Sequence, residues 1–160
     1  YLDLVLLMAS DKRKEAKELI DGYFTTYPGV KQFMDDSIDR AREKGYVETI
    51  FKRKRLLKDI NSKNAVVRGY AERNAINAPI QGSAADIIKV AMINIHKEII
   101  DNNLESKMIL QVHDELVFDV VPSEKDKIEK IALEQMKNAV KTSVPLEVEG
   151  AFGLTWLEAH

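Results

Sequence analysis

The sequence KMILQVHDELVFDVV, residues 107–121, contains two apolar runs with a short polar step between them. Residues 107–112 and 115–121 favour extended backbone, and only His113 and Asp114 separate them. Two such runs joined by two residues predict a tight antiparallel hairpin. The polar step would then lie at the turn between two strands.

A long helical pattern precedes this hairpin. Between about residues 64 and 102, apolar residues recur at the spacing of one helix face. Pro79 and Gly82 lie inside the pattern, and we expect them to kink or divide the helix, because proline removes a backbone donor and clashes with the preceding turn. The predicted core face consists of Ala84, Ile88, Ala91, Met92, Ile95 and Ile99.

A further helix is predicted after the hairpin, opened by Pro122 and stopped by Pro145. Its inward side chains are predicted to be Ile128, Ile131, Ala132, Met136, Ala139 and Val140. Residues 146–151 are predicted to form a last strand before a short tail that contains Trp156.

Two helices are predicted near the start of the chain. Apolar stripes over residues 16–27 and 30–41 follow the spacing of amphipathic helices, with Ser10 or Asp11 available to cap the first. We expect the two to form a helical hairpin with its aromatic residues in the core, namely Tyr23, Phe24, Tyr27 and Phe33.

A smaller β-hairpin is predicted over residues 46–60, where two extended stretches flank a basic turn. Helices and antiparallel hairpins thus alternate along the chain. The predicted class is α+β, an antiparallel sheet packed on helices.

Composition limits the function classes. With 160 residues, of which 45% are hydrophobic and 31% charged, the chain can bury one ordinary core. It has no cysteine, which excludes a disulfide framework and a thiolate zinc site and fits a reducing cytoplasm. The apolar run 4–8 is too short to span a membrane. Because the chain starts at Tyr1, we expect further sequence upstream.

Positive charge is concentrated in one segment, although the net charge is only -2. Residues 42–73 hold ten Lys or Arg against four Asp or Glu, a local balance of +6. Clustered cations favour a surface that faces nucleic acid, because they release counterions from a phosphate backbone. A solvated surface with a basic bias is the alternative that charge alone leaves open.

The step His113-Asp114-Glu115 places ionisable side chains beside two apolar runs. A carboxylate next to a sheet core has an electrostatic cost unless a cation compensates it, and Mg²⁺ is a natural compensator because it prefers carboxylate oxygens. The alternative is an ordinary polar turn in water. The triplet therefore predicts either a metal-binding corner or a solvated turn.

Three polar residues recur at helical spacing within the long helix, at i, i+4 and i+8: Arg73, Asn77 and Gln81. Their donors suit a surface that contacts sugar, phosphate or minor-groove acceptors, and an exposed polar face is the alternative. The run of four cations at residues 52–55 would suit phosphate contacts or a solvated turn.

Two longer motifs carry a family resemblance. Residues 71–89, AERNAINAPIQGSAADIIK, followed by residues 111–117, QVHDELV, closely resemble the C-terminal part of the family A DNA polymerases. GYVET at 45–49 and WLEAH at 156–160 resemble that family in the same order. The resemblance covers nearly the whole chain from about residue 11.

The resemblance implies part of a polymerase shaped like a right hand. Residues 1–44 would belong to the helical part of the fingers, and residues 45–160 to the palm and fingers with a palm-type sheet. Asp114 would be a catalytic residue and a ligand of a catalytic Mg²⁺ pair, Glu115 a secondary catalytic acid, and His113 a neighbour of the primer end.

The same resemblance implies primer–template DNA and deoxynucleoside triphosphates as partners, with no membrane. DNA contacts near the primer 3′ end are implied for Arg73, Asn77 and Gln81. The implied mechanism is two-metal nucleotidyl transfer.

Departures from the family pattern are informative. The first palm motif, with its aspartate, and the fingers helix that contacts the nucleotide are absent from the sequence. We therefore expect a C-terminal fragment that is inactive alone and that self-associates through apolar surface left uncovered. Lys52 and Lys58 stand where the family usually has Gly and Pro, which puts the turn type of the basic hairpin in question.

Two other classes of function are alternatives. A non-catalytic nucleic-acid-binding module would bind DNA indifferently to Asp114→Asn and Mg²⁺, and a helical interaction domain would not bind DNA even at low salt.

Overall fold

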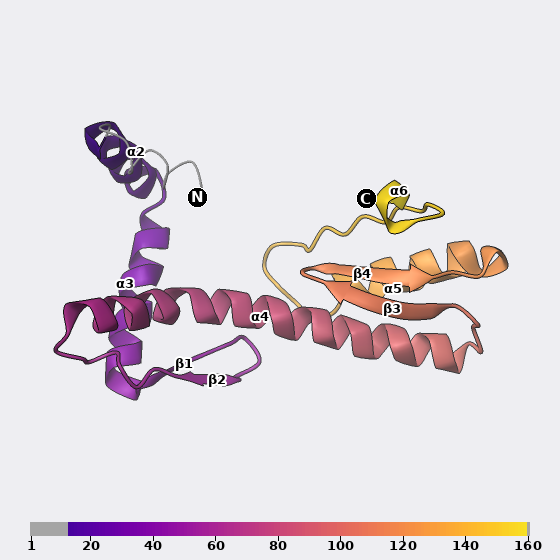
Figure 1. Cartoon of the computed structure of the whole chain (residues 1–160), viewed down its shortest axis with the longest axis horizontal. Coiled ribbons are helices and arrows are strands. Elements are labelled where there is room, and N and C mark those ends of the chain that lie inside the picture. Colours follow the sequence, from indigo (N-terminus) through magenta and orange to yellow (C-terminus); the bar gives the residue numbers. More distant parts are fainter. Residues whose placement is uncertain (1–12, 160) are drawn as a thin grey trace. The chain divides into compact units, whose positions relative to one another are not determined.

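Residues 13–159 are described by a computed structural model of the chain (Figure 1). In chain order they form α2 (Arg13–Thr26), α3 (Pro28–Lys44), β1 (Tyr46–Glu48), β2 (Lys54–Leu56), α4 (Ala65–Asp101), β3 (Lys107–Val112), β4 (Glu115–Asp119), the 3-10 helix η1 (Pro122–Glu124), α5 (Lys125–Lys137) and α6 (Trp156–Ala159). The predicted caps Ser10 and Asp11 lie outside the described residues. Within the described part, none of the helices combines the length and apolar content needed to cross a membrane.

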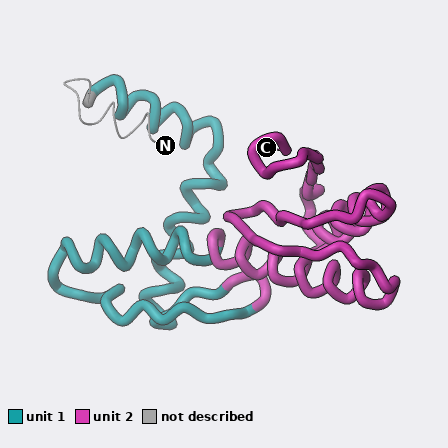
Figure 2. The backbone as a smooth tube through the Cα atoms, turned by 45° about the vertical axis from the view of Figure 1, so that its right-hand side comes forward, with its two compact units in different colours: residues 1–48, 52–79 teal, residues 49–51, 80–160 magenta. Residues whose placement is uncertain are grey.

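The described chain divides into two compact units, drawn in different colours in Figure 2. Unit 1 contains the residues up to 48 and residues 52–79, and unit 2 contains residues 49–51 and those from 80 onward. Each unit has one antiparallel two-stranded sheet, β1–β2 in unit 1 and β3–β4 in unit 2. The predicted α+β class and both predicted hairpins are confirmed.

The two N-terminal helices are confirmed, and only Tyr27 separates them. The second helix begins at Pro28 rather than at Val30, because proline fits the first turn of a helix, where its missing N–H is not needed. It ends at Lys44 and is capped by Gly45, whose φ of 75° is the left-handed conformation that glycine adopts most readily. The Gly45 N–H donates to the Ala41 carbonyl at 2.8 Å, which closes the helix.

Small side chains dominate the core of unit 1. Helix α4 contributes three buried alanines that permit close backbone approach, and α3, β1 and the segment after β2 complete the cluster: Ala41, Val47, Leu57, Ile60, Ala71, Ala75 and Ala78. The Leu57 N–H donates to the Gly45 carbonyl at 2.8 Å, which ties the end of the hairpin to the end of α3.

The aromatic residues of α2 are not in this core. Tyr23 and Tyr27 are 50% and 55% exposed, and Phe24 and Phe33 are half-buried. Tyr23 instead contacts Phe24 and Tyr27, with ring centroids 5.6 and 5.2 Å apart. The predicted core role of this stripe is therefore wrong for the two tyrosines, because the cluster is built by α3, the hairpin and α4.

Helix α4 runs without a break from Ala65 to Asp101 and has Pro79 inside it. The expected division at Pro79 and Gly82 is wrong. A proline within a helix forfeits one backbone hydrogen bond, and a helix of 37 residues keeps the bonds on both sides of that position.

The core of unit 2 uses larger side chains. Helices α4 and α5 pack together and against the β3–β4 hairpin, burying Ala91, Ile95, Ile99, Ile128, Ile131 and Ala139. Half-buried Leu116 and Phe118 of β4 pack against this cluster. Ala84, predicted for the same face, is exposed, because the packed part of this helix face begins only at Ile87 and Ile88.

The last predicted strand is not formed. Residues 146–151 belong to neither a helix nor a strand, although half-buried Leu146 and Val148 alternate with exposed Glu147 and Glu149. Alternation suits a strand, but a strand also needs a neighbour for its backbone hydrogen bonds, and β3 and β4 pair with each other alone among the described residues. The predicted strand is therefore wrong.

Substitution of Ile95 tests the core of unit 2. Ile95 is 0% exposed, so Ile95→Ala is expected to lower the free energy of unfolding by about 3 kcal/mol through lost burial and an unfilled cavity. Ile93→Ala is the matched control on the same helix, since Ile93 is 68% exposed and its loss is expected to change stability by less than about 0.5 kcal/mol. Urea unfolding would measure both values, and equal losses would contradict the packing described for α4.

Candidate active site and nucleic-acid interface

The turn between β3 and β4 carries the predicted catalytic residues. Val112 pairs with Glu115 across the hairpin, which leaves His113 and Asp114 as the turn. His113 has a φ of 52°, a left-handed conformation that a tight two-residue turn requires of at least one member. The Gln111 side-chain amide donates to the His113 carbonyl and holds the turn from the strand before it.

The turn presents its ionisable groups to solvent. His113 and Asp114 are exposed and Glu115 is half-buried. The electrostatic cost expected for a carboxylate beside the sheet core is therefore small at Asp114, because water solvates it. The hairpin ladder places this carboxylate at a fixed point without burying it.

Asp114 and Glu115 fit part of a magnesium shell. Within residues 13–159, no three histidine or acidic side chains gather closely enough to hold a metal ion by themselves. Mg²⁺ is often held by only one or two protein carboxylates and keeps several waters. An exposed aspartate with an adjacent glutamate suits that partial role, and the described residues supply no complete cage.

The polar row of α4 is exposed, as expected for a contact surface. Arg73, Asn77 and Gln81 all lie on the surface. In unit 1, Arg73 and Asn77 lie one helical turn apart, and the buried positions between and beside them are the core alanines Ala75 and Ala78. One helix therefore separates a small apolar face from a polar one.

The predicted site residues belong to two groups. His113, Asp114 and Glu115 are brought together by the unit 2 hairpin, and Arg73 and Asn77 by the unit 1 part of α4. Gln81 is on α4 in unit 2.

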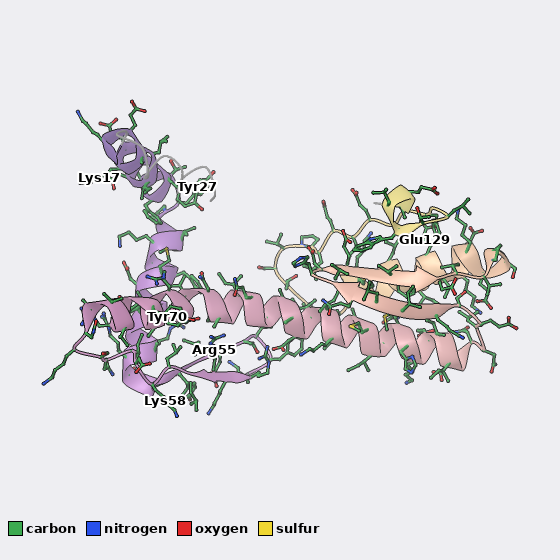
Figure 3. The ribbon with its side chains drawn as sticks, viewed as in Figure 1. Lys17, Tyr27, Arg55, Lys58, Tyr70 and Glu129 are labelled. Atoms are coloured by element: carbon green, nitrogen blue, oxygen red, sulfur yellow. The ribbon has the colours of Figure 1, made fainter. Side chains whose placement is uncertain are left out.

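Two cations of the basic hairpin contact other side chains of unit 1. The Lys54 ammonium lies 4.3 Å from the centre of the Tyr46 ring. The guanidinium of Arg55, which is labelled in Figure 3, donates to the Asn74 side-chain oxygen at 3.2 Å. The four cations of residues 52–55 are nevertheless all exposed. The run is thus a structured cationic edge rather than an irregular solvated loop.

Acidic partners offset some of the positive charge nearby. Glu72 accepts a hydrogen bond from Arg42 at 2.7 Å and lies 3.6 Å from the guanidinium of Arg68. These pairs are partly solvated and contribute little stability individually. They orient two arginines of the basic segment along α3 and α4.

Sequence reasoning missed Asn74 and Tyr70. Asn74 anchors Arg55, and exposed Tyr70 lies with its ring centre 5.9 Å from the Arg73 guanidinium. The i, i+3 spacing of Tyr70 and Arg73 is a signal that could have revealed their contact. No local pattern relates Asn74 to Arg55, because 19 residues separate them.

Comparison with known proteins gives consistent matches. The sequence matches the model of DNA polymerase family A over residues 7–158. The DNA polymerase I of Streptococcus pneumoniae serotype 4 is 53% identical over 147 residues, which cover 92% of this chain and 17% of that protein. The DNA polymerase I of Geobacillus stearothermophilus is 48% identical over 147 residues, with the same two coverages of 92% and 17%.

A solved structure also matches. The POL domain of Pol1 from M. smegmatis, in complex with DNA primer-template and dNTP, aligns with a TM-score of 0.90 at 48% sequence identity. The match covers 91% of this chain and 26% of that one. The chain thus spans only a small share of the proteins that it matches.

Substitution of Lys52 tests the turn of the basic hairpin. Lys52 has a φ of 65°, which costs a side chain energy that glycine avoids, so Lys52→Gly is expected to be more stable than Lys52→Ala by about 1 kcal/mol. Both variants remove the same charge, and only glycine relieves the backbone. Thermal or urea unfolding would measure the difference, and equal stability of the two variants would contradict the left-handed backbone at this position.

Proposed function

The chain belongs to DNA polymerase family A, and we propose that the protein it represents is a DNA-directed DNA polymerase. The proposed reaction adds deoxynucleotides from their triphosphates to the 3′ end of a primer paired to a template. The observation that carries this proposal is the exposed Asp114, held at the turn of an antiparallel hairpin within the family match. The similarity to a Pol1 domain in complex with primer-template and dNTP supports the same substrates.

Asp114 is proposed to hold the catalytic Mg²⁺, with Glu115 as a secondary catalytic acid beside it. Two bound ions would supply activation of the primer 3′-hydroxyl and neutralisation of charge on the leaving pyrophosphate. The chain's own contribution is positional. The hairpin holds the Asp114 carboxylate in solvent at a defined turn, with His113 beside it as the proposed neighbour of the primer end.

DNA binding is assigned to the exposed polar and cationic residues. Arg73, Asn77 and Gln81 offer guanidinium and amide donors that suit sugar, phosphate and minor-groove acceptors. The cations of residues 52–55 would add phosphate contacts that do not depend on sequence.

The chain by itself is proposed to be inactive. It spans 17% of its DNA polymerase I relatives, and its described residues offer one exposed carboxylate turn for a two-ion reaction.

We assign residues 1–44 to the helical part of the fingers and residues 45–160 to the palm and fingers. We also assign the protein to the cytoplasm, where its proposed substrates are, and expect the isolated chain to self-associate through exposed apolar side chains such as Leu154 and Leu157.

The catalytic role of Asp114 is tested by primer extension with the full-length protein in Mg²⁺. Asp114→Ala is expected to lower the extension rate by about three orders of magnitude or more, because a metal ligand is lost while the exposed site leaves the fold intact. Binding of primer–template is expected to change little.

Asp119→Ala is the matched control for that experiment. Asp119 is also an exposed aspartate of the same hairpin, but it lies on β4 at the end away from the turn, so its loss is expected to leave extension near the parent rate. Equal extension by the parent and Asp114→Ala would reject the catalytic assignment. Retained DNA binding without Mg²⁺-dependent synthesis in the parent would favour a non-catalytic binding module.

The DNA contact of Arg73 is tested by the salt dependence of primer–template binding. Arg73→Ala is expected to weaken binding by about 1–3 kcal/mol if its guanidinium contacts acceptor groups of the bases. If the contact is to phosphate, the slope of log K against log salt should fall by about one. Arg40→Ala, which removes an exposed arginine of α3 outside the row, is the control. Equal effects of the two substitutions would show that the row has no special role.

A further inference from the structure

The open end of the β3–β4 hairpin is closed by a network around Glu124. One carboxylate oxygen of Glu124 accepts from the Glu105 N–H at 3.0 Å. The other accepts from the Ser106 N–H at 2.9 Å and from the Ser106 hydroxyl at 2.6 Å. The Ser106 hydroxyl in turn accepts from the Val121 N–H at 3.0 Å. The Glu124 carboxylate therefore holds the two residues just before β3, and the Ser106 hydroxyl links them to Val121, which follows β4 by two positions.

The hydrogen bonds of this network are well defined, because Ser106 is buried and its hydroxyl has a partner in each role. Ser106 is only 2% exposed, so its hydroxyl needs protein partners, and it has one donor and one acceptor role filled. Glu124 also donates its backbone N–H to the Val121 carbonyl at 2.8 Å. Because α5 starts at Lys125, the network joins both strand ends to the N-cap residue of that helix.

Strand β3 contains a bulge, which makes the register of the hairpin depend on contacts at its open end. Met108 pairs with Phe118 and Leu110 pairs with Val117, so β3 has one extra residue at this point. A bulge leaves one residue unpaired and disrupts the hydrogen-bond ladder locally, and a slip by one residue would turn every side chain of the strand to the opposite face. The connection at Ser106 lies beyond the bulge, at the end of the hairpin opposite to Asp114.

We propose that Glu124 is a positioning residue that fixes the register of the hairpin and thereby the place of Asp114 at its turn. The inference rests on the proposed polymerase function for its consequence in catalysis, and on the hydrogen-bond network alone for its effect on the hairpin. Glu124 acts through the strands and touches none of the site residues assigned above.

The charge state of Glu124 suits this role. Hydrogen bonds from the Ser106 hydroxyl and from the backbone of Glu105 and Ser106, with the nearby Lys127 ammonium, lower the pKa of the Glu124 carboxyl below its usual value. A lowered pKa means that the stabilising contribution is present above the usual carboxyl range and is lost only as the pH falls through the lowered pKa. At neutral pH the carboxylate is ionised and accepts from three donors.

The test uses the full-length protein with Glu124→Gln, Ser106→Ala and the double variant. Glutamine keeps the size of the side chain but turns an amide N–H₂ toward groups that are themselves donors. The readouts are the rate of single-nucleotide addition at saturating dNTP and primer–template, per folded molecule, and amide hydrogen exchange across residues 105–121. Glu134→Gln is the matched control, because Glu134 is an exposed glutamate of α5 that forms a long, solvated ion pair with Lys130 at 4.0 Å.

Both single variants are expected to slow nucleotide addition by about tenfold or more, with faster exchange confined to the hairpin. The double variant should be no slower than the singles, because all three break one network. The apparent dissociation constants for dNTP and DNA should stay within about twofold, and Glu134→Gln should match the parent. A rate within twofold of the parent for Glu124→Gln would overturn the proposal.

Faster exchange throughout unit 2 would also overturn it, because Glu124 would then support stability in general. If the parent itself adds no nucleotide, the proposed function fails, and the exchange data still test whether the Glu124 network holds the hairpin. Faster exchange confined to the hairpin would support it, and unchanged exchange would reject it.

Discussion

Antiparallel pairing of β3 with β4 is the constraint on which the candidate site depends. The pairing of Val112 with Glu115 leaves only two residues to reverse the chain, so His113 and Asp114 must lie at the tip of the hairpin. A carboxylate in that place is solvated, yet the ladder behind it fixes its backbone. The paired strands thus fix the backbone of an exposed residue. A change in the register of the two strands would displace Asp114.

Helix α4 has a buried side that contributes to a core and an exposed side that carries polar residues. In unit 1 its buried side is made of alanines, which let α3 and the β1–β2 hairpin approach closely, and its exposed side carries Arg73 and Asn77. In unit 2 its buried side is made of larger residues such as Ile95 and Ile99, which pack on α5 and the β3–β4 hairpin. Each core is therefore completed without using the polar row, and that row stays available to a ligand.

Much of the fold could be predicted from local patterns, because helix periodicity and the two hairpin signals depend on neighbouring residues. The wrong predictions all concern features that depend on residues outside the local sequence pattern. The alternation of residues 146–151 suits a strand, but only another strand can pair with it. The rings of Tyr23 and Tyr27 follow an amphipathic stripe, but the packing of the other elements decides whether such a stripe is covered. At Pro79, the remaining hydrogen bonds of a long helix outweigh a local breaker signal.

The candidate site also combines features that local sequence predicts with contacts that it does not predict. The exposed turn with Asp114 and the exposed row with Arg73 were predictable, because a polar step in a hairpin and polar residues at i, i+4 are local features. The contacts of Arg55 with Asn74 and of Ser106 with Glu124 were not, since 19 and 18 residues separate the partners. Residues proposed to contact substrate are therefore visible in the sequence, whereas those proposed to position them emerge only when the chain is folded. Unless the rate per folded molecule is measured, a substitution at a positioning residue would resemble a stability defect. Local sequence patterns alone would therefore underestimate how much of the chain supports the candidate site.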